Sequence, residues 1–339
     1  MADEIAPVAE TWGIAADAAS THANSVVWDN TVPWREYGDP KLREACLPRM
    51  KAAGHDVVSL TLAGDRDSLP GTIHAIAKQR DYFACRPDEF VLALSVADIE
   101  HARREDKLAI VFHFQGSNPV DNDVAMVELY YRLGIRHILL VYNLKNPVGD
   151  GCKERTDAGL SRFGESLIAE MNRVGMQVDC SHAGYRTSMD AMEMSSAPVI
   201  FSHSNALAMN NHPRNLRDEQ MKACAATGGV IGVNGVGLFL GHNDCSVANQ
   251  LRHIDYMADL VGPEHLGLGS DYTYHPQVTS PSAWNPPHAG DVPWSDIQYA
   301  PPEQTPKLTE ALLDRGYSDS DVSGMLGGNW MRVARAVWK

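Results

Sequence analysis

The sequence lacks any apolar run that approaches the roughly 20 residues needed to cross a membrane. Its first residues, MADEI, carry acids where a signal peptide has a basic region followed by an apolar core. The six cysteines are scattered and form no C-x-x-C pair, which favours a reducing compartment over a disulfide framework. We therefore expect a soluble cytoplasmic protein that does not bind a membrane.

Basic residues are also in short supply. The chain has 29 Lys and Arg residues against 43 Asp and Glu residues, and its formal net charge is -14. Nucleic-acid binding depends largely on Lys and Arg that neutralise phosphates, so this balance argues against DNA or RNA as a partner. No glycine-rich phosphate loop follows the first predicted strand, which disfavours a doubly wound nucleotide-binding sheet.

Short β-rich runs alternate with helical patterns along the chain, as in repeated βα units with a parallel sheet. Two of the predicted helices have a clear apolar face, one over residues 167–174 and one over residues 251–261, and the second ends at Gly262-Pro263. The eight predicted strands begin with residues 26–28, 57–60, 109–112, 138–141, 177–180, 198–201, 230–233 and 266–268.

Eight such strands in 339 residues predict a (β/α)8 TIM barrel. We expect one barrel domain over residues 1–339, preceded by an N-terminal helix at about residues 1–24. A long stretch rich in Pro, Trp and His follows the last strand, at about residues 272–306. A loop at that position lies over the catalytic mouth of a barrel, so it is predicted to act as a lid or specificity element.

Polar residues at the ends of predicted strands are the best candidates for chemistry, because the strand ends of a barrel converge on one small volume. His182 follows the fifth predicted strand, His203 the sixth and Asp271 the eighth. Two imidazoles and a carboxylate can bind a divalent ion and leave a position open for water, whose pKa would fall toward about 7. A structural histidine is the alternative for either His alone.

Three segments resemble the membrane dipeptidase family of metallopeptidases, peptidase family M19. The longest runs from Gly159 to Gly235 and contains the motifs D-x-S-H and F-S-H-S. The others are Gly269-Ser270-Asp271 and the C-terminal GGNWMR at residues 327–332. The resemblance implies a (β/α)8 TIM barrel of the metal-dependent hydrolase type. Such an enzyme would cleave a dipeptide or a related amide of an amino acid, with zinc as its cofactor and often with a homodimeric assembly.

The resemblance also implies roles for individual residues. His182 and His203 match two metal ligands, and Asp271 matches the aspartate that handles the proton of the attacking water. Arg214 matches the arginine that binds the carboxylate of a small-molecule substrate, a task for which a planar guanidinium is suited because it donates two parallel hydrogen bonds. Tyr142 lies where a phenol would contact the substrate and could stabilise a developing oxyanion, with interior packing as the alternative.

The resemblance implies a site for a pair of zinc ions, and the other half of that site departs from the family pattern in this sequence. An H-x-D motif should follow the first strand, but one alignment places Thr31 and Pro33 there, and a shift by two residues places Asp29 and Thr31 there. The expected bridging glutamate is Gln115, whose neutral amide is a poor bridge between two dications. Gln115 can still coordinate one ion. His113 lies on the same strand face, either as a replacement ligand or as a core histidine.

These departures favour one zinc ion per chain, with two ions or none as alternatives. They leave three functional hypotheses. The first is a single-metal hydrolase of dipeptides, and the second is the same fold acting on another carboxylated amino-acid derivative. The third is an inactive binding protein, since a barrel fold does not guarantee activity.

Overall fold

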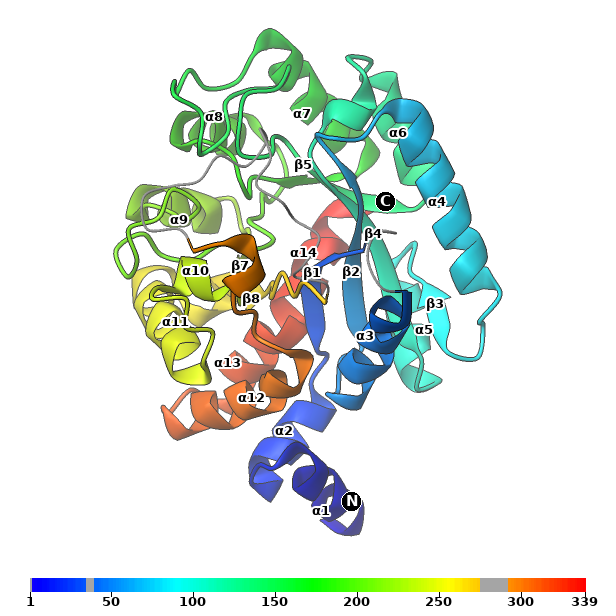
Figure 1. Cartoon of the computed structure of the whole chain (residues 1–339), viewed down its shortest axis with the longest axis vertical. Helices are drawn as coiled ribbons and strands as arrows, with labels where there is room; N and C mark the ends of the chain where they lie inside the picture. Colours follow the sequence, from blue (N-terminus) through cyan, green and yellow to red (C-terminus); the bar gives the residue numbers. More distant parts are fainter. Residues whose placement is uncertain (1, 35–39, 275–291) are drawn as a thin grey trace.

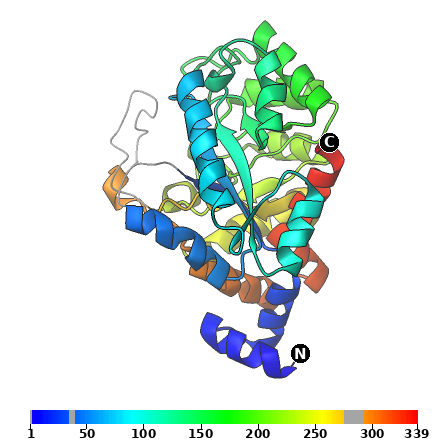
Figure 2. The ribbon, with the colours of Figure 1, turned by 90° about the vertical axis from the view of Figure 1, so that its right-hand side faces the viewer.

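The computed structural model of the protein describes residues 2–34, 40–274 and 292–339. Parallel strands form a curled sheet in the centre, and helices surround it on the outside (Figures 1 and 2). The strands are β1 (Trp28–Pro33), β2 (Val57–Gly64), β3 (Phe90–Leu92), β4 (Leu108–Gln115), β5 (Ile135–Leu139), β6 (Gln177–Asp179), β7 (Ile231–Val233) and β8 (Leu266–Leu268).

Helices connect these strands, and further helices precede β1 and follow β8. The α-helices are α1 (Ala2–Trp12), α2 (Ala16–Asn24), α3 (Pro40–Ala52), α4 (Leu69–Ala84), α5 (Val96–Arg104), α6 (Ala125–Arg132), α7 (Arg162–Val174), α8 (Tyr185–Met194), α9 (Asp218–Ala226), α10 (Gly237–Leu240), α11 (Val247–Val261), α12 (Thr305–Asp314), α13 (Asp319–Ser323) and α14 (Asn329–Val337). Short helical turns are η1 (Asn118–Val120), η2 (Pro263–His265), η4 (Trp294–Asp296), η5 (Pro302–Gln304) and η6 (Gly324–Gly328).

The strands follow one another around a barrel in the order β6-β5-β4-β2-β1-β8-β7. The gap between β6 and β7 is filled by the chain around residues 200–201. Ile200 exchanges backbone hydrogen bonds with the β6 side, at Val178 and Cys180, and Phe201 does so with the β7 side, at Val230 and Gly232. These bonds close the ring, so the predicted (β/α)8 barrel is confirmed.

Seven of the eight predicted strands are present, and residues 198–201 occupy the eighth strand position through isolated bridges instead of a regular strand. The structure also contains β3, which was not predicted and pairs only with the first residues of β4. The predicted N-terminal helix is two helices, because Gly13 has φ of 65°, a left-handed conformation that ends α1.

Helix α7 shows how the sequence places one helix against the barrel. Ser161 precedes it and its Oγ accepts a hydrogen bond from the Gly164 amide at 3.0 Å, which satisfies one of the unpaired amides at the helix start. Gly175 ends the helix with φ of 91°. The apolar side chains predicted to share a face, Leu167, Ile168, Met171 and Val174, are all buried.

The loop after β8 lies partly outside the described residues, since residues 275–291 belong to neither described range. Its described end, residues 292–304, contains η4 and η5, and α12 begins at Thr305. Within the described ranges, no helix has both the length and the apolar character that a bilayer crossing requires.

Candidate active site

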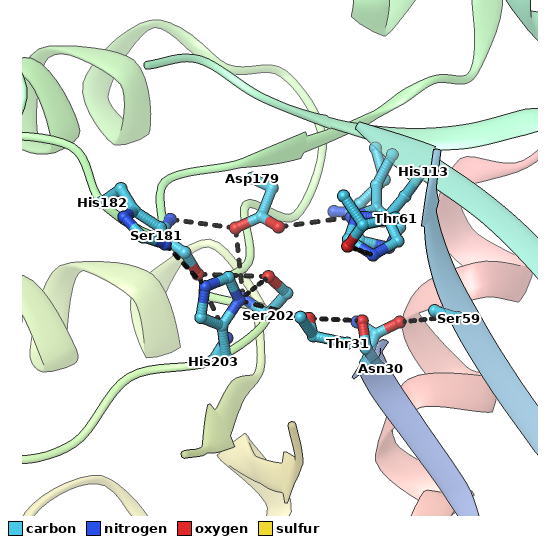
Figure 3. Close-up of polar contacts among 12 residues, drawn as sticks. Asn30, Thr31, Ser59, Thr61, His113, Asp179, Ser181, His182, Ser202 and His203 are labelled. Carbon is cyan, nitrogen blue, oxygen red and sulfur yellow. Dashed lines mark hydrogen bonds and ion pairs between the residues drawn. The ribbon is translucent and has the colours of Figure 1, made fainter. Parts of the chain in front are cut away.

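The two histidines predicted as metal ligands meet at the C-terminal end of the barrel. His182 follows β6 and His203 follows the 200–201 segment, and their Nε2 atoms lie 2.9 Å apart (Figure 3). Both residues are buried. The sequence prediction that these two side chains share one site is therefore consistent with the geometry.

Tyr142 and Asn143, which follow β5 in the sequence, fix the orientation of His182. Its Nδ1 lies 2.7 Å from Oδ1 of Asn143, and the Tyr142 ring stacks on its imidazole with centroids 4.1 Å apart. An amide oxygen only accepts, so Nδ1 of His182 is the donor and Nε2 has a free lone pair. A metal ligand needs this arrangement, in which an outer residue sets the tautomer. The sequence alone did not single out Asn143.

Several hydroxyl groups surround His203. Its Nδ1 lies 2.8 Å from Ser202 Oγ and 3.2 Å from Thr31 Oγ1, and its amide donates to Ser181 Oγ at 3.1 Å. Burial lowers the pKa of His203 to about 3, and Arg214 acts in the same direction. The pKa of His182 is lowered well below its usual value for the same two reasons. Both imidazoles are therefore neutral at pH 7, the form that binds metal.

Glycines let the neighbouring strands approach this pair. A Cβ on Gly232 would lie 2.0 Å from the Ser202 carbonyl oxygen, and a Cβ on Gly269 would lie 1.9 Å from it. Such distances are far below van der Waals contact, so both positions exclude any larger residue. The close approach brings the end of β8, and with it Asp271, to the side of the barrel where His203 lies.

Asp271 and Gln115 form the next part of the site. Burial raises the pKa of the Asp271 carboxyl to about 7, an effect that Arg214 and Asn234 partly offset. Asn234, a second residue not predicted from the sequence, lies 3.5 Å from Asp271 Oδ2. Gln115 ends β4, is 8% exposed and is close enough to lower the pKa of Asp271. Within the described part of the chain, its Nε2 has no hydrogen-bond partner.

Arg214 lies between this site and an open cavity. It is only 3% exposed, donates from Nη2 to the His203 carbonyl at 3.2 Å, and packs over the Phe239 ring. Among the residues that the structure describes, its Nε has no hydrogen-bond partner. Together with His182 it lines a cavity of about 360 Å³. A buried guanidinium with an unused donor at a cavity wall is suited to an anionic ligand.

The residues present fit one metal ion better than two. A tetrahedral ion with Zn–N bonds of about 2.0–2.1 Å separates two ligand nitrogens by about 3.3 Å, so the histidine pair would open by about 0.4 Å. Among the described residues, no group of three or more His, Cys, Asp or Glu side chains is arranged to hold an ion. A further ligand would have to be an amide such as Gln115, a hydroxyl or water.

Two of the side chains at the expected H-x-D positions make local hydrogen bonds within the protein. Asp29 accepts hydrogen bonds from the amides of Thr31 and Ser270 and from the Ser270 hydroxyl. Thr31 Oγ1 donates a hydrogen bond to the Asn30 carbonyl at 2.6 Å. The side chain of Pro33 has no atom that can coordinate a metal ion. In either alignment these described positions lack the histidine that the family motif has.

His113 occupies the barrel interior at a distance from the histidine pair (Figure 3). Its Nε2 bonds to Thr61 Oγ1 at 2.9 Å, and its ring stacks on His137 with centroids 4.0 Å apart. These contacts favour the core interpretation over that of a replacement ligand.

Two buried aspartates that the sequence did not reveal hold the strand ends together. Asp179 Oδ1 accepts from the amides of Ser181 and Ser202, one on each histidine-bearing segment. Burial opposes ionisation of Asp179, but its hydrogen bond with His137 keeps its pKa below the usual value. Asp65, after β2, accepts from the Tyr142 amide at 2.8 Å and so fixes the loop that carries Tyr142.

A closed parallel barrel with a histidine pair at its strand ends is typical of metal-dependent hydrolases. The sequence profile of the membrane dipeptidase family, peptidase family M19, matches residues 19–285. This match covers most of the chain, and the protein therefore belongs to the membrane dipeptidase family.

Relatives of known sequence and structure agree with this assignment. A protein encoded in the pqqA 5' region of Klebsiella pneumoniae is 33% identical over 73% of this chain and 89% of its own length. An uncharacterised dipeptidase of Schizosaccharomyces pombe is 35% identical over 70% of this chain but only 54% of its own length. The structure of an amidohydrolase from Pseudomonas aeruginosa is 30% identical, covers 95% of this chain and 99% of its own, and has a TM-score of 0.85.

A more distant structure shares the fold. It is a metallopeptidase from Rhodobacter sphaeroides liganded with a phosphinate mimic of the dipeptide L-Ala-D-Ala. Its identity is 21%, the match covers 93% of this chain and 100% of the other, and the TM-score is 0.76.

Proposed function

We propose that this protein cleaves the amide bond of a dipeptide or of a related N-acyl amino acid, with one zinc ion per chain. The observation that carries the proposal is the meeting of His182 and His203 at 2.9 Å between Nε2 atoms, with the lone pair of His182 directed by Asn143. Membership of the family supports a metal cofactor, and the printed names of relatives support dipeptides as substrates.

His182 and His203 would hold the ion, with Gln115 as a neutral additional ligand. When bound, zinc supplies Lewis acidity and lowers the pKa of a coordinated water toward about 7. A single ion needs less ligand charge than a pair, which is compatible with an amide at the position of the bridging glutamate.

The remaining steps belong to the protein's own side chains. Asp271, with a pKa of about 7, is suited to accept the proton of the attacking water and to pass it to the leaving amine as the C–N bond breaks. Arg214 would bind the substrate carboxylate through two parallel hydrogen bonds. Tyr142, stacked on His182, would donate its phenol proton in a hydrogen bond to the developing oxyanion.

The cavity beside Arg214 gives a direction to the substrate. Arg214 and His182 line the same cavity. A substrate whose carboxylate is bound at Arg214 can therefore extend through this cavity toward His182. We further propose a cytoplasmic location, which the six free cysteines support. A homodimeric assembly stays a prediction.

A second candidate function uses the same site on another carboxylated amino-acid derivative. The missing ligands on β1 favour it, because paired metals clamp the carbonyl and supply hydroxide together, and one ion alone does less for peptide hydrolysis. Carboxylate binding at Arg214 would be unchanged.

The test is a turnover assay of zinc-loaded protein with dipeptides and N-acyl amino acids. We expect cleavage that Asp271→Asn reduces by at least about 100-fold, as for loss of a general base, while zinc content is kept. Asp259→Asn, an exposed aspartate on α11, is the matched control and should be fully active. If nothing is cleaved but other carboxylated metabolites raise the melting temperature, the second candidate replaces the first.

A further inference from the structure

Strand β1 contains a β-bulge where the family has its first metal ligands. Asp29 pairs with Val58 and Val32 pairs with Leu60, so β1 has one residue more than β2 between these pairs. A bulge re-aims side chains next to active sites. Here it places both Asn30 and Thr31 in the interior, where each is almost fully buried.

A chain of hydrogen bonds fastens the bulge to the neighbouring strand. The Trp28 indole donates to Ser59 Oγ at 2.9 Å, and Ser59 Oγ donates to Asn30 Oδ1 at 2.7 Å. Figure 3 shows this chain running from Ser59 through Asn30 and Thr31 toward His203. The position of Thr31 is therefore set by buried partners that lie outside the ligand pair.

The hydroxyl proton of Thr31 is already committed. Thr31 Oγ1 donates to the Asn30 carbonyl at 2.6 Å, so toward His203 Nδ1, 3.2 Å away, it can only accept. Ser202 Oγ also contacts this nitrogen, at 2.8 Å, but its hydroxyl can rotate to donate or to accept. Of the two hydroxyls, only Thr31 distinguishes between the tautomers of His203.

The distinction matters because His182 and His203 face each other through Nε2. Asn143 leaves a lone pair on His182 Nε2, so without metal the short contact requires the proton of His203 to lie on its own Nε2. A metal ion needs the opposite tautomer, with the proton on Nδ1. That tautomer can donate to Thr31.

We propose that Thr31 is a positioning residue that stabilises the metal-binding tautomer of His203. The proposal builds on the single-metal site of the proposed function, and it assigns a new task to the position where the family has a ligand. Thr31 does not touch the ion. It accepts the Nδ1 proton of His203 and thereby keeps Nε2 free to coordinate.

The test measures zinc affinity by competition with a chromophoric chelator. Thr31→Val keeps the shape and removes the acceptor, and we expect it to weaken zinc binding by about tenfold, as for loss of an outer-shell partner. Thr31→Ser keeps the hydroxyl and should bind within about twofold of the wild type. Thr61→Val is the matched control, because Thr61 is an equally buried threonine on β2 that bonds to His113 instead.

A second readout needs neither metal nor activity. The ¹⁵N shifts of His203 report its tautomer, and they are read in metal-free His182→Ala, where no facing lone pair holds the proton on His203 Nε2. In that background Thr31→Val should shift the population toward the proton on Nε2, whereas Thr61→Val should not. Wild-type zinc affinity in Thr31→Val, an equal loss in Thr61→Val, or an unchanged tautomer would overturn the proposal. If the wild type binds no zinc, the proposed function fails, and the tautomer measurement still decides the role of Thr31.

Discussion

Acid should weaken the packing of the N-terminal helices through one buried histidine. His22 on α2 lies against Thr309 of α12 at 2.7 Å and against the Ala53 carbonyl at 3.0 Å. Burial lowers its pKa from 6.5 to about 4, although the hydrogen bond to Ala53 acts in the opposite direction. Protonation in the folded state is therefore disfavoured relative to the unfolded chain.

The sign and size of the effect follow from this difference in pKa. Because the folded pKa is below the unfolded one, the contribution of His22 is fully present above pH 6.5 and is lost as the pH falls toward 4. Between pH 7.5 and pH 5.0 the loss for a pKa that falls from 6.5 to about 4 is about 2 kcal/mol. Nearby His55, whose pKa burial also lowers to about 4, adds to the slope of the wild type.

The assay is urea denaturation of metal-free protein at pH 7.5 and at pH 5.0, followed by tryptophan fluorescence. His22→Gln cannot titrate, so the fall in its free energy of unfolding between the two pH values should be smaller than that of the wild type by about 2 kcal/mol. His74→Gln, at an exposed position on α4, should fall as the wild type does. An equal fall in His22→Gln and the wild type would refute the reasoning.

Two further predictions concern the site and its support. Arg214→Lys should raise KM for a carboxylated substrate by about tenfold or more with a smaller effect on kcat, because a point charge cannot donate two parallel hydrogen bonds; an unchanged KM would remove Arg214 from the substrate site. Asp65→Ala should lower the free energy of unfolding by about 3 kcal/mol, because the partly buried amides of Asn118 and Tyr142 lose their acceptor. Urea denaturation checks this, and a loss below about 1 kcal/mol would contradict it.

The alternation of apolar runs and amphipathic helices was enough to predict the barrel. The prediction of a regular strand at residues 198–201 is the exception. The backbone there joins β6 and β7 through isolated bridges, and the residue pattern of such a segment does not differ from that of a strand in a continuous ladder. Strand β3 escaped prediction because three residues, Phe90–Leu92, carry too little periodicity. The break between α1 and α2 depends on Gly13, whose left-handed conformation the sequence permits but does not require.

For the site, the sequence indicated the residues that we propose carry chemistry but missed those that orient them. His182 and His203 follow predicted strands, so their convergence could be expected. Asn143 and Asp65 act through partners 39 and 77 residues away, at His182 and Tyr142, and such pairings depend on the tertiary fold. The bulge at Thr31 is a similar case, because one extra residue in β1 becomes visible only when β2 lies beside it.

The metal content of purified protein tests the central claim most directly. After reconstitution with zinc and dialysis against a mild chelator, mass spectrometry of the elements should find one zinc per chain in the wild type. His182→Ala and His203→Ala should each fall to background, whereas His113→Gln should keep its zinc because His113 bonds to Thr61 in the interior. Two ions per chain, or full zinc content in either alanine variant, would contradict the single-metal site proposed for this protein.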